Sequence, residues 1–302
     1  MSRPAPARTA STNLGSSPGH RVLDGKVGIV TGASRGIGAA IARKLASQGC
    51  NLVLNYTSES STKITEDLAS ELKSEYGVEA VPVQASMGSE NGPEHIVEVA
   101  KNHFTHPKTN KFQIDVIINN AGVAGNNVLG KIKADDFARQ YNINVRGPLF
   151  LVQAALPYLP HDRSGRIVNL SSVSSSLGYI SQSVYGGTKS ALEAMTRTWA
   201  RELAERATVN AINPGPVATD MYTSTDEAFV DQNRPFIQHT PLATPREGID
   251  PKEVWHPLEK TGGRAAYSEE IAGVVAMLCS PEAGWSTGSV VCANGGMVFS
   301  TV

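Results

Sequence analysis

The sequence has few cysteines and almost no net charge. Only three of its 302 residues are cysteines, namely Cys50, Cys279 and Cys292, and no two of them form a CxxC pair. This usage is typical of a reduced, intracellular protein, and we expect a cytoplasmic one. The 27 basic residues are balanced by 28 acidic residues. That balance gives no support for nucleic acid or an anionic membrane as a partner.

Long apolar runs and clustered metal ligands are also missing. No apolar run approaches the roughly 18 residues that cross a bilayer, so we expect no membrane span. The seven histidines are scattered along the chain. His103 and His106 have helical spacing, but no cysteine or acidic ligand lies beside them in the sequence. We therefore expect no metal site.

Residues 1–22 differ in composition from the rest of the chain. They contain no apolar core, which excludes a secretory signal. Three arginines, several serines and no acid leave a transit peptide open as an alternative. Because the proline, serine, alanine and glycine there bury little surface, a disordered tail is favoured. Residues 23–302 are then expected to form a single domain.

Short β-branched segments alternate with helical patterns along that domain. Strands are predicted over residues 26–31, 51–56, 79–84, 115–119, 166–171, 208–212 and 289–293. Helices are predicted over 37–45, 64–76, 96–104, 135–156, 184–206 and 268–278. This alternation is typical of an α/β fold with a parallel sheet between two layers of helices. The proline-containing segment 220–257 breaks the rhythm and is predicted to be a long loop that acts as a substrate lid.

A glycine-rich turn, TGASRGIG, connects the first predicted strand to the first helix. Gly32, Gly36 and Gly38 allow a tight turn and a close approach of the backbone to a pyrophosphate, which the helix N-terminus attracts. The same residues match the hydrolase motif G-x-S-x-G, with Ser34 as nucleophile. The position after the first strand and the spacing of Ile37 and Gly38 favour a dinucleotide site.

The end of the second strand indicates which dinucleotide binds. NAD enzymes carry an acidic residue there, about 20 residues after the glycines. This chain instead has Asn55, Tyr56, Thr57 and Ser58. With no carboxylate to repel it, a 2′-phosphate can be bound by Arg35 together with the hydroxyls. The sequence therefore predicts NADP(H).

Tyr185 and Lys189 are four residues apart in YGGTK, a spacing that places both on one face of a helix. A nearby ammonium is expected to lower a phenol pKa that is about 10 when free. Such a phenol can act as an acid or base near neutral pH. Combined with a dinucleotide site, the pair predicts hydride transfer to or from a carbonyl.

Six segments together resemble the classical short-chain dehydrogenase/reductase family from about Leu23 to Met297. They are TGASRGIG at 31–38, NNAG at 119–122, NINVRG at 142–147, NLSSVS at 169–174, YGGTK at 185–189 and NPGPVATDM at 213–221. The resemblance implies a Rossmann-type, doubly wound parallel sheet of seven strands.

The resemblance also implies roles for particular residues. Asn144 would hold a proton-relay water or merely satisfy backbone groups, and Ser172 would bond the substrate oxygen, although neighbouring serines leave a one-residue shift open. Tyr185 would be the acid/base, and Lys189 would lower its pKa and bind the nicotinamide ribose. The resemblance implies further cofactor contacts at Ser34, Ile37, Ser86, Asn120, Ala121, Gly122, Pro214, Gly215, Val217 and Thr219. At Ser86 the chain departs from the family, which usually has Asp or Asn facing the adenine there. Substrate contacts are assigned to Ser174, Tyr179 and Tyr222.

The favoured function is NADP(H)-dependent reduction of a ketone or other carbonyl to an alcohol. The lid contains aromatic residues, namely Tyr222, Phe229, Phe236 and Trp255, that either line an apolar pocket for a bulky cyclic or aromatic ketone or are ordinary packing. A 3-oxoacyl thioester is the next candidate, and imine reduction, epimerisation and dehydration stay open. A non-catalytic NADP-binding regulator is the remaining class, which the intact tyrosine–lysine pair disfavours.

The two long predicted helices carry more apolar positions than one sheet face needs. Examples are Phe150, Leu151, Ala155, Met195, Trp199 and Leu203. Surplus apolar surface is typical of an interface. The resemblance implies that these helices pair across a two-fold axis, and a second such contact would give a homotetramer, with a homodimer as the alternative.

Overall fold

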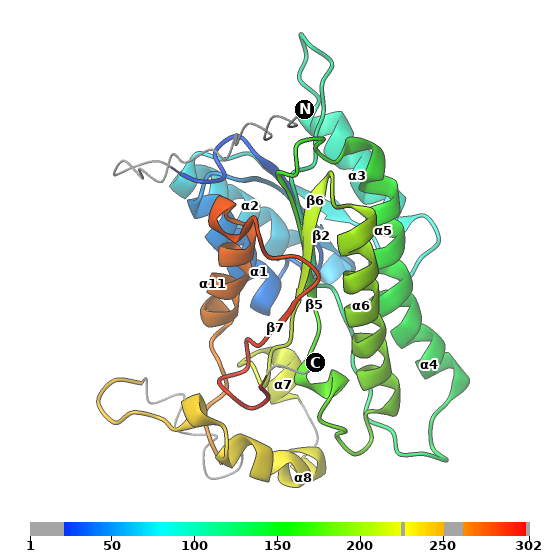
Figure 1. The fold of residues 1–302 in the computed structure, drawn as a ribbon, viewed down its shortest axis with the longest axis vertical. Coiled ribbons are helices and arrows are strands. Elements are labelled where there is room, and N and C mark those ends of the chain that lie inside the picture. Colours follow the sequence, from blue (N-terminus) through cyan, green and yellow to red (C-terminus); the bar gives the residue numbers. More distant parts are fainter. Residues whose placement is uncertain (1–20, 225–226, 251–261, 300–302) are drawn as a thin grey trace, which may run out of the picture.

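A computed structural model describes residues 21–224, 227–250 and 262–299 (Figure 1). Trp255 and residues 1–20 of the expected tail lie outside the described residues. Arg21 belongs to the described part, and it donates hydrogen bonds to the carbonyl of Tyr76 and to Asp24. In these ranges no helix is both long and apolar enough to cross a membrane.

Seven strands form one sheet in the order β3-β2-β1-β4-β5-β6-β7. All six neighbouring pairs are parallel. The strands are β1 Val27–Val30, β2 Asn51–Tyr56, β3 Ala80–Gln84, β4 Val116–Asn119, β5 Gly165–Leu170, β6 Ala207–Ile212 and β7 Val290–Val291. The strand order reverses between β1 and β4, which is where doubly wound sheets bind their ligands. The predicted seven-stranded parallel sheet is confirmed.

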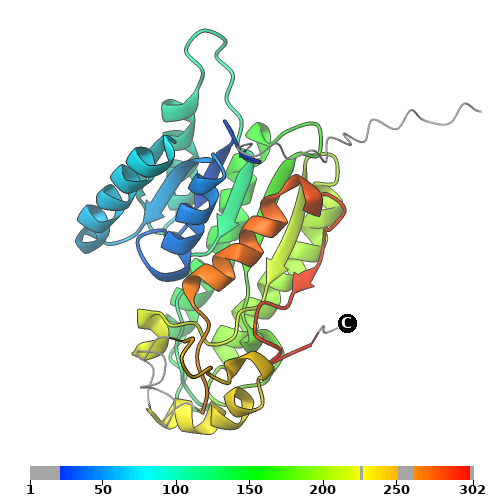
Figure 2. The ribbon, with the colours of Figure 1, turned by 90° about the vertical axis from the view of Figure 1, so that its left-hand side faces the viewer.

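Helices cover both faces of the sheet (Figure 1). One layer consists of α1 Gly36–Ser47, α2 Thr62–Tyr76 and α11 Ser268–Cys279. In Figure 2, α1 and α11 lie side by side in front of the sheet. The opposite layer consists of α3 Gly92–Phe104, α4 Ala134–Tyr141, α5 Gly147–Ala155 and α6 Ser183–Glu202.

The core consists of two apolar layers, one on each face of the sheet. Side chains alternate between them along each strand, since successive residues of a strand point to opposite faces. Ile117 and Val53 pack in the layer beneath α3, α5 and α6, whereas Ile118 and Leu54 pack in the layer beneath α1 and α11. All four are fully buried. Burial on both faces explains why these strands read as continuous apolar runs.

The long helix predicted over residues 135–156 is interrupted. Between α4 and α5 lies a π-helical turn, η2, at Asn142–Arg146, in which the Gly147 amide bonds the carbonyl of Asn142. In a regular α-helix the Asn144 carbonyl would accept from residue 148, but Pro148 has no amide hydrogen. Single π turns of this kind occur frequently at functional sites.

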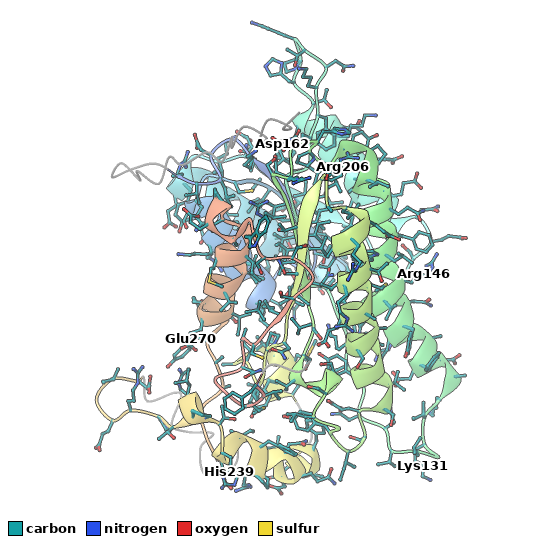
Figure 3. All side chains as sticks on the ribbon, viewed as in Figure 1. Lys131, Arg146, Asp162, Arg206, His239 and Glu270 are labelled. Atoms are coloured by element: carbon teal, nitrogen blue, oxygen red, sulfur yellow. The ribbon has the colours of Figure 1, made fainter. Side chains whose placement is uncertain are left out.

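The described part of the segment that was expected to be a long loop after β6, residues 220–224 and 227–250, is largely helical. It contains α7 Asp220–Thr223, α8 Glu227–Gln238 and the short helix η5 Pro241–Ala243. Helix α8 crosses below the carboxyl ends of the strands (Figure 1). In Figure 3, His239 just after α8 and Lys131 in the β4–α4 connection mark this end, whereas Asp162 and Arg206 mark the opposite end.

The apolar surplus on the two long helices is smaller than expected. Leu151, Ala155, Trp199 and Leu203 belong to the intramolecular core, so their assignment to an interface is wrong. Apolar surface is nevertheless exposed along α4, α5 and the turn that follows, at Phe137, Leu149, Phe150 and Leu156. Such a row is typical of a surface that another subunit covers.

We therefore expect the protein to be a homo-oligomer, with a tetramer favoured over a dimer. Light scattering at micromolar concentration should give a mass that is a multiple of the 32.0 kDa chain. Replacing Phe137 and Phe150 by serine should lower that mass, while the same change at exposed Phe299 serves as the control. A mass of one chain for the unmodified protein would contradict this expectation.

Candidate active site at the carboxyl ends of the strands

A cavity of about 560 Å³ opens at the carboxyl ends of the strands. It brings together most of the residues that the sequence assigned to a site: Gly32, Ser34, Arg35, Gly36, Ile37, Gly38, Asn120, Ala121, Gly122, Ser172, Ser174, Tyr179, Tyr185, Lys189, Pro214, Gly215, Val217, Thr219 and Tyr222. The assigned residues that do not line it are Asn55, Tyr56, Thr57, Ser58, Ser86 and Asn144. In the described ranges no group of three or more acidic, histidine or cysteine side chains could hold a metal.

The glycine-rich turn forms one wall of this cavity. Gly32 and Gly36 have positive φ angles of 64° and 53°. A side chain at Gly38 is excluded sterically, because its Cβ would lie 2.1 Å from the Gly32 carbonyl oxygen. Helix α1 begins at Gly36, so its N-terminal amides face the cavity beside the turn. Backbone amides and a helix N-terminus are the groups that hold a pyrophosphate.

Two asparagines form hydrogen bonds with this turn, since the Gly32 amide donates to Asn55 and the Gly32 carbonyl accepts from Asn120. Asn120 donates to the carbonyls of Thr31 and Gly32, at 2.8 and 3.1 Å. The fully buried Asn55 donates to the carbonyls of Val83 and Ala85. Both side-chain amides therefore donate to backbone carbonyls at the carboxyl ends of β1 and β3.

Arg35 lies between α1 and the segment that follows β2. Its guanidinium donates to the Ser61 hydroxyl at 3.1 Å, and Ser61 in turn bonds the Ser58 hydroxyl at 3.0 Å. An exposed ion pair with Asp220 spans 3.4 Å, and such pairs stabilise little. Sequence reasoning missed Ser61, although it lies only three residues after Ser58.

Ser86 and Tyr56 occupy less direct positions. The Ser86 hydroxyl accepts a hydrogen bond from the Gly88 amide at 3.2 Å, so it organises its own loop. Tyr56 is almost wholly buried at the end of β2. Thr57 is exposed just beyond it.

Tyr185 and Ser172 meet on the opposite wall of the cavity. Tyr185 lies in the first turn of α6, and Ser172 follows β5 and caps a short helix by accepting from the Ser174 amide at 3.1 Å. Ser172 also donates to the Ser174 hydroxyl at 3.0 Å. Ser172 and Tyr185 both line the cavity, and the Ser172 hydroxyl is near enough to the phenol to lower its pKa. The serine assigned to the substrate oxygen is therefore the one beside the phenol.

Lys189 lies one helical turn beyond Tyr185 and is only 4% exposed. Its ammonium nitrogen is 5.6 Å from the centre of the Tyr185 ring. It donates a hydrogen bond of 2.7 Å to the carbonyl of Leu170, the last residue of β5. This bond connects the second turn of α6 to the carboxyl end of β5, an inner strand of the sheet.

The electrostatics differ from the expectation based on spacing. Burial raises the pKa of Tyr185, and the hydrogen bond with Ser172 only partly opposes that effect. Burial also lowers the pKa of Lys189 to about 8, against an upward influence from Glu193. The expectation that Lys189 leaves the Tyr185 pKa below its usual value is thus wrong for this structure, because desolvation outweighs the other effects.

Asn144 fixes the π turn to its neighbours. Its side-chain amide donates to the carbonyl of Val123 at 2.8 Å and to the Thr188 hydroxyl at 3.0 Å, while its oxygen accepts from the Val123 amide. Thr188 bonds the carbonyl of Tyr185. The side chain is therefore occupied, and Pro148 leaves the backbone carbonyl of Asn144 without its usual helical donor.

The outer part of the cavity has an aromatic side and a polar side. The Tyr179 ring meets Phe229 and Phe236 of α8 edge to face, with centroid separations of 5.9 and 5.3 Å. Polar side chains of Asn126, Gln182 and Asn233 also line the cavity.

Sequence reasoning missed these three polar residues. Gln182 donates to Asn126 at 3.0 Å, and Asn233 donates to the Phe229 carbonyl at 2.7 Å. The position of Gln182 three residues before Tyr185 is a helical spacing that pointed to it. Asn233 had no such signal, because its helix was expected to be loop.

Comparison with known proteins agrees with this arrangement. The sequence profile described as short chain dehydrogenase matches residues 26–229. The chain belongs to the short chain dehydrogenase family. Its described strands and the cavity at the reversal of strand order are those that the sequence resemblance implied.

Relatives of the chain include two fungal reductases. An L-xylulose reductase of Aspergillus niger is 52% identical, over 93% of this chain and 99% of that protein. An L-xylo-3-hexulose reductase of Hypocrea jecorina is 50% identical over the same shares. Among solved structures, a blue fluorescent protein from a metagenomic library in complex with NADPH has a TM-score of 0.77 and 33% identity. It covers 92% of this chain and all of that one.

Proposed function

We propose that the protein is an NADP(H)-dependent reductase that converts a ketone to an alcohol, with Tyr185 as the proton donor. The observation that carries the proposal is that Ser172 and Tyr185 line the same cavity, with the buried Lys189 ammonium 5.6 Å from the centre of the phenol ring. The glycine-rich wall described above lies across the same cavity. A carbonyl placed between them would meet two hydroxyl donors.

The cofactor end of the cavity fits NADP(H). Gly38 leaves the close approach that a pyrophosphate needs. At the end of β2, Arg35 and the hydroxyls of Ser58 and Ser61 form a group that suits a phosphate, and β2 ends without a carboxylate. The solved relative named above is itself a complex with NADPH. When bound, the reduced cofactor supplies the hydride.

The residues around the carbonyl act on its oxygen. Ser172 and Tyr185 donate hydrogen bonds that stabilise the negative charge developing there. Tyr185 then transfers its phenolic proton to the alkoxide. The Lys189 ammonium, 5.6 Å from the ring centre, stabilises the phenolate that this transfer leaves. The Asn144 carbonyl is suited to hold the water through which the proton is replaced.

A polyhydroxylated ketone of the ketose class is the substrate we favour. The two fungal relatives, both about half identical to this chain, are named as reductases of ketoses. The amide groups of Asn126, Gln182 and Asn233 supply donors and acceptors for substrate hydroxyls beside Ser172 and Ser174. Sites with such groups discriminate strongly against analogues without hydroxyls, because their buried polar atoms are then left unpaired.

A bulky aromatic ketone is the second candidate. The cluster of Tyr179, Phe229 and Phe236 favours it, since edge-to-face rings form an apolar surface on which another ring can pack. The same cluster would equally cover the carbon face of a sugar. Direct comparison of the two substrate classes is therefore needed.

A substrate panel should distinguish these candidates. We expect kcat/KM with NADPH to be at least about tenfold higher for ketopentoses and ketohexoses than for aromatic ketones such as tetralones. Replacing Gln182 by leucine should lower kcat/KM for ketoses by about tenfold or more, and Phe236→Leu serves as the matched control on the aromatic wall. Faster reduction of aromatic ketones would make the second candidate correct.

Tyr185→Phe should abolish turnover while leaving NADPH affinity nearly unchanged. The substitution removes the proton donor but little of the surface that holds the cofactor, and loss of acid catalysis costs about 10²–10⁴ in rate. Stopped-flow absorbance and fluorescence titration measure the two quantities. Retention of more than about a tenth of the rate would refute the assigned role, whereas NADPH binding without turnover of any carbonyl by the unmodified protein would favour a regulatory function.

Arg35→Ala should raise the KM for NADPH about tenfold or more and leave the KM for NADH nearly unchanged. The lost guanidinium is the cation beside Ser58 and Ser61, and a charge-assisted bond to phosphate exists only in NADPH. Arg43→Ala, which removes an exposed arginine of the same helix, is the control. Equal kcat/KM for both cofactors in the unmodified protein would contradict the choice of NADP(H).

A further inference from the structure

Glu193 is a buried carboxylate next to the catalytic residues but outside the cavity. It lies on α6, one turn beyond Lys189, and is 8% exposed. The Ser171 hydroxyl, directly before Ser172, donates to it at 2.6 Å. Burying a carboxylate is unfavourable unless hydrogen bonds or an opposite charge compensate for it. One hydroxyl alone compensates only modestly for the burial of this carboxylate. The positive group closest to it along α6 is the Lys189 ammonium, one helical turn away.

Few other charges can act on the Lys189 ammonium. Strands β5 and β6, the short helix η4 at Val173–Ser175, the π turn and α4 all pack against α6. Neither β6 nor η4 carries a titratable side chain. The titratable side chains that these other elements carry are Arg166 of β5, Arg146 of the π turn, and Asp135, Asp136, Arg139 and Tyr141 of α4.

The charged groups among these are engaged elsewhere or exposed to solvent. Arg166 lies at the opposite end of β5 and donates to backbone carbonyls there. The Arg146 guanidinium lies over the Phe150 ring, 5.1 Å from its centre. Asp136 pairs with Arg139 at 3.0 Å, and Asp135 is exposed to solvent. Glu193, one turn along α6 from Lys189, raises the pKa of that ammonium against the effect of burial.

We propose that Glu193 is a positioning residue whose negative charge keeps the buried Lys189 in its ammonium form, while Ser171 holds the carboxylate in place. The proposal rests on the function proposed above, in which the Lys189 ammonium stabilises the phenolate of Tyr185. Glu193 itself touches neither the substrate nor the cofactor site. Its effect reaches the reaction only through Lys189.

The sign of the expected pH effect follows from the charge on Lys189. Burial lowers its pKa to about 8, and Glu193 opposes that shift. Ketone reduction therefore falls as pH rises through the pKa of Lys189, because the ammonium is lost. Without the Glu193 charge the ammonium is less stable, so its pKa drops further. The loss of activity then occurs at lower pH.

Two variants separate the charge from the hydrogen bond. Glu193→Gln keeps the size and an oxygen that accepts from Ser171, but it removes the charge. Ser171→Ala removes the bond and keeps the charge. In Glu193→Gln we expect the fall of kcat/KM at high pH (the high-pH limb) to shift to lower pH by about one unit, while kcat/KM at about pH 6 decreases little. In Ser171→Ala the limb should move less.

Glu202→Gln is the matched control, since it removes an exposed carboxylate from the same helix and should leave the limb in place. A Glu193→Gln profile that is uniformly lower but unshifted would show a merely structural role and overturn the proposal. That outcome is distinct from failure of the proposed function, which would appear as an active Tyr185→Phe variant.

A second measurement needs no substitution at position 193. The high-pH limb of the unmodified enzyme is recorded at about 0.05 M and about 0.5 M salt, because salt screens exposed charges far more than buried ones. A limb that stays in place supports a buried source such as Glu193. A limb that moves to lower pH with salt places the source at the surface and overturns the proposal, even if Glu193→Gln fails to fold.

Discussion

The hydrogen bond from Lys189 to the Leu170 carbonyl is the interaction on which the site depends. It joins the start of α6 to the carboxyl end of β5 over 2.7 Å, and Lys189 is almost wholly buried. Together with the packing of α6 on β6, this bond holds the helix that carries Tyr185 beside the strand that leads to Ser172. An ammonium buried to this extent also becomes sensitive to any nearby charge. The lowered Lys189 pKa is a consequence of that burial, and Glu193 opposes it.

The remaining parts of the site are arranged around that anchor by the sheet. The reversal of strand order between β1 and β4 separates the glycine-rich turn from the Ser172–Tyr185 wall and leaves the cavity between them. Asn144 connects the two sides, because it bonds Val123 after β4 and Thr188 on α6. Helix α8 completes the outer part with both aromatic and amide side chains. The residues at the catalytic end of the cavity thus lie at the ends of strands or on α6. The residues suited to select the substrate lie on α8 and in the segments that connect strands to helices.

Much of this arrangement was predictable from the sequence because each element is locally consistent. Strands such as Asn51–Tyr56 are buried on both faces and therefore appear in the sequence as apolar runs. The glycines before the first helix are required sterically, because a Cβ at Gly38 would collide with the Gly32 carbonyl. The π turn was missed because the hydrophobic pattern continues through it, and only Pro148 marks it. Helix α8 was taken for a loop because Pro235 lies inside it. The pKa values were missed because desolvation depends on tertiary burial, which the spacing of Tyr185 and Lys189 does not contain.

The central claim is that a hydride from NADPH reaches a ketose carbonyl while the chain supplies the proton. The most direct test is single-turnover reduction of a ketopentose with NADPH that carries deuterium at C4 of the nicotinamide, followed by mass spectrometry and NMR of the product. The account predicts one deuterium on the new alcohol carbon for each cofactor oxidised, from one of the two C4 faces only. A product without deuterium at that carbon, or no product despite cofactor binding, would contradict it.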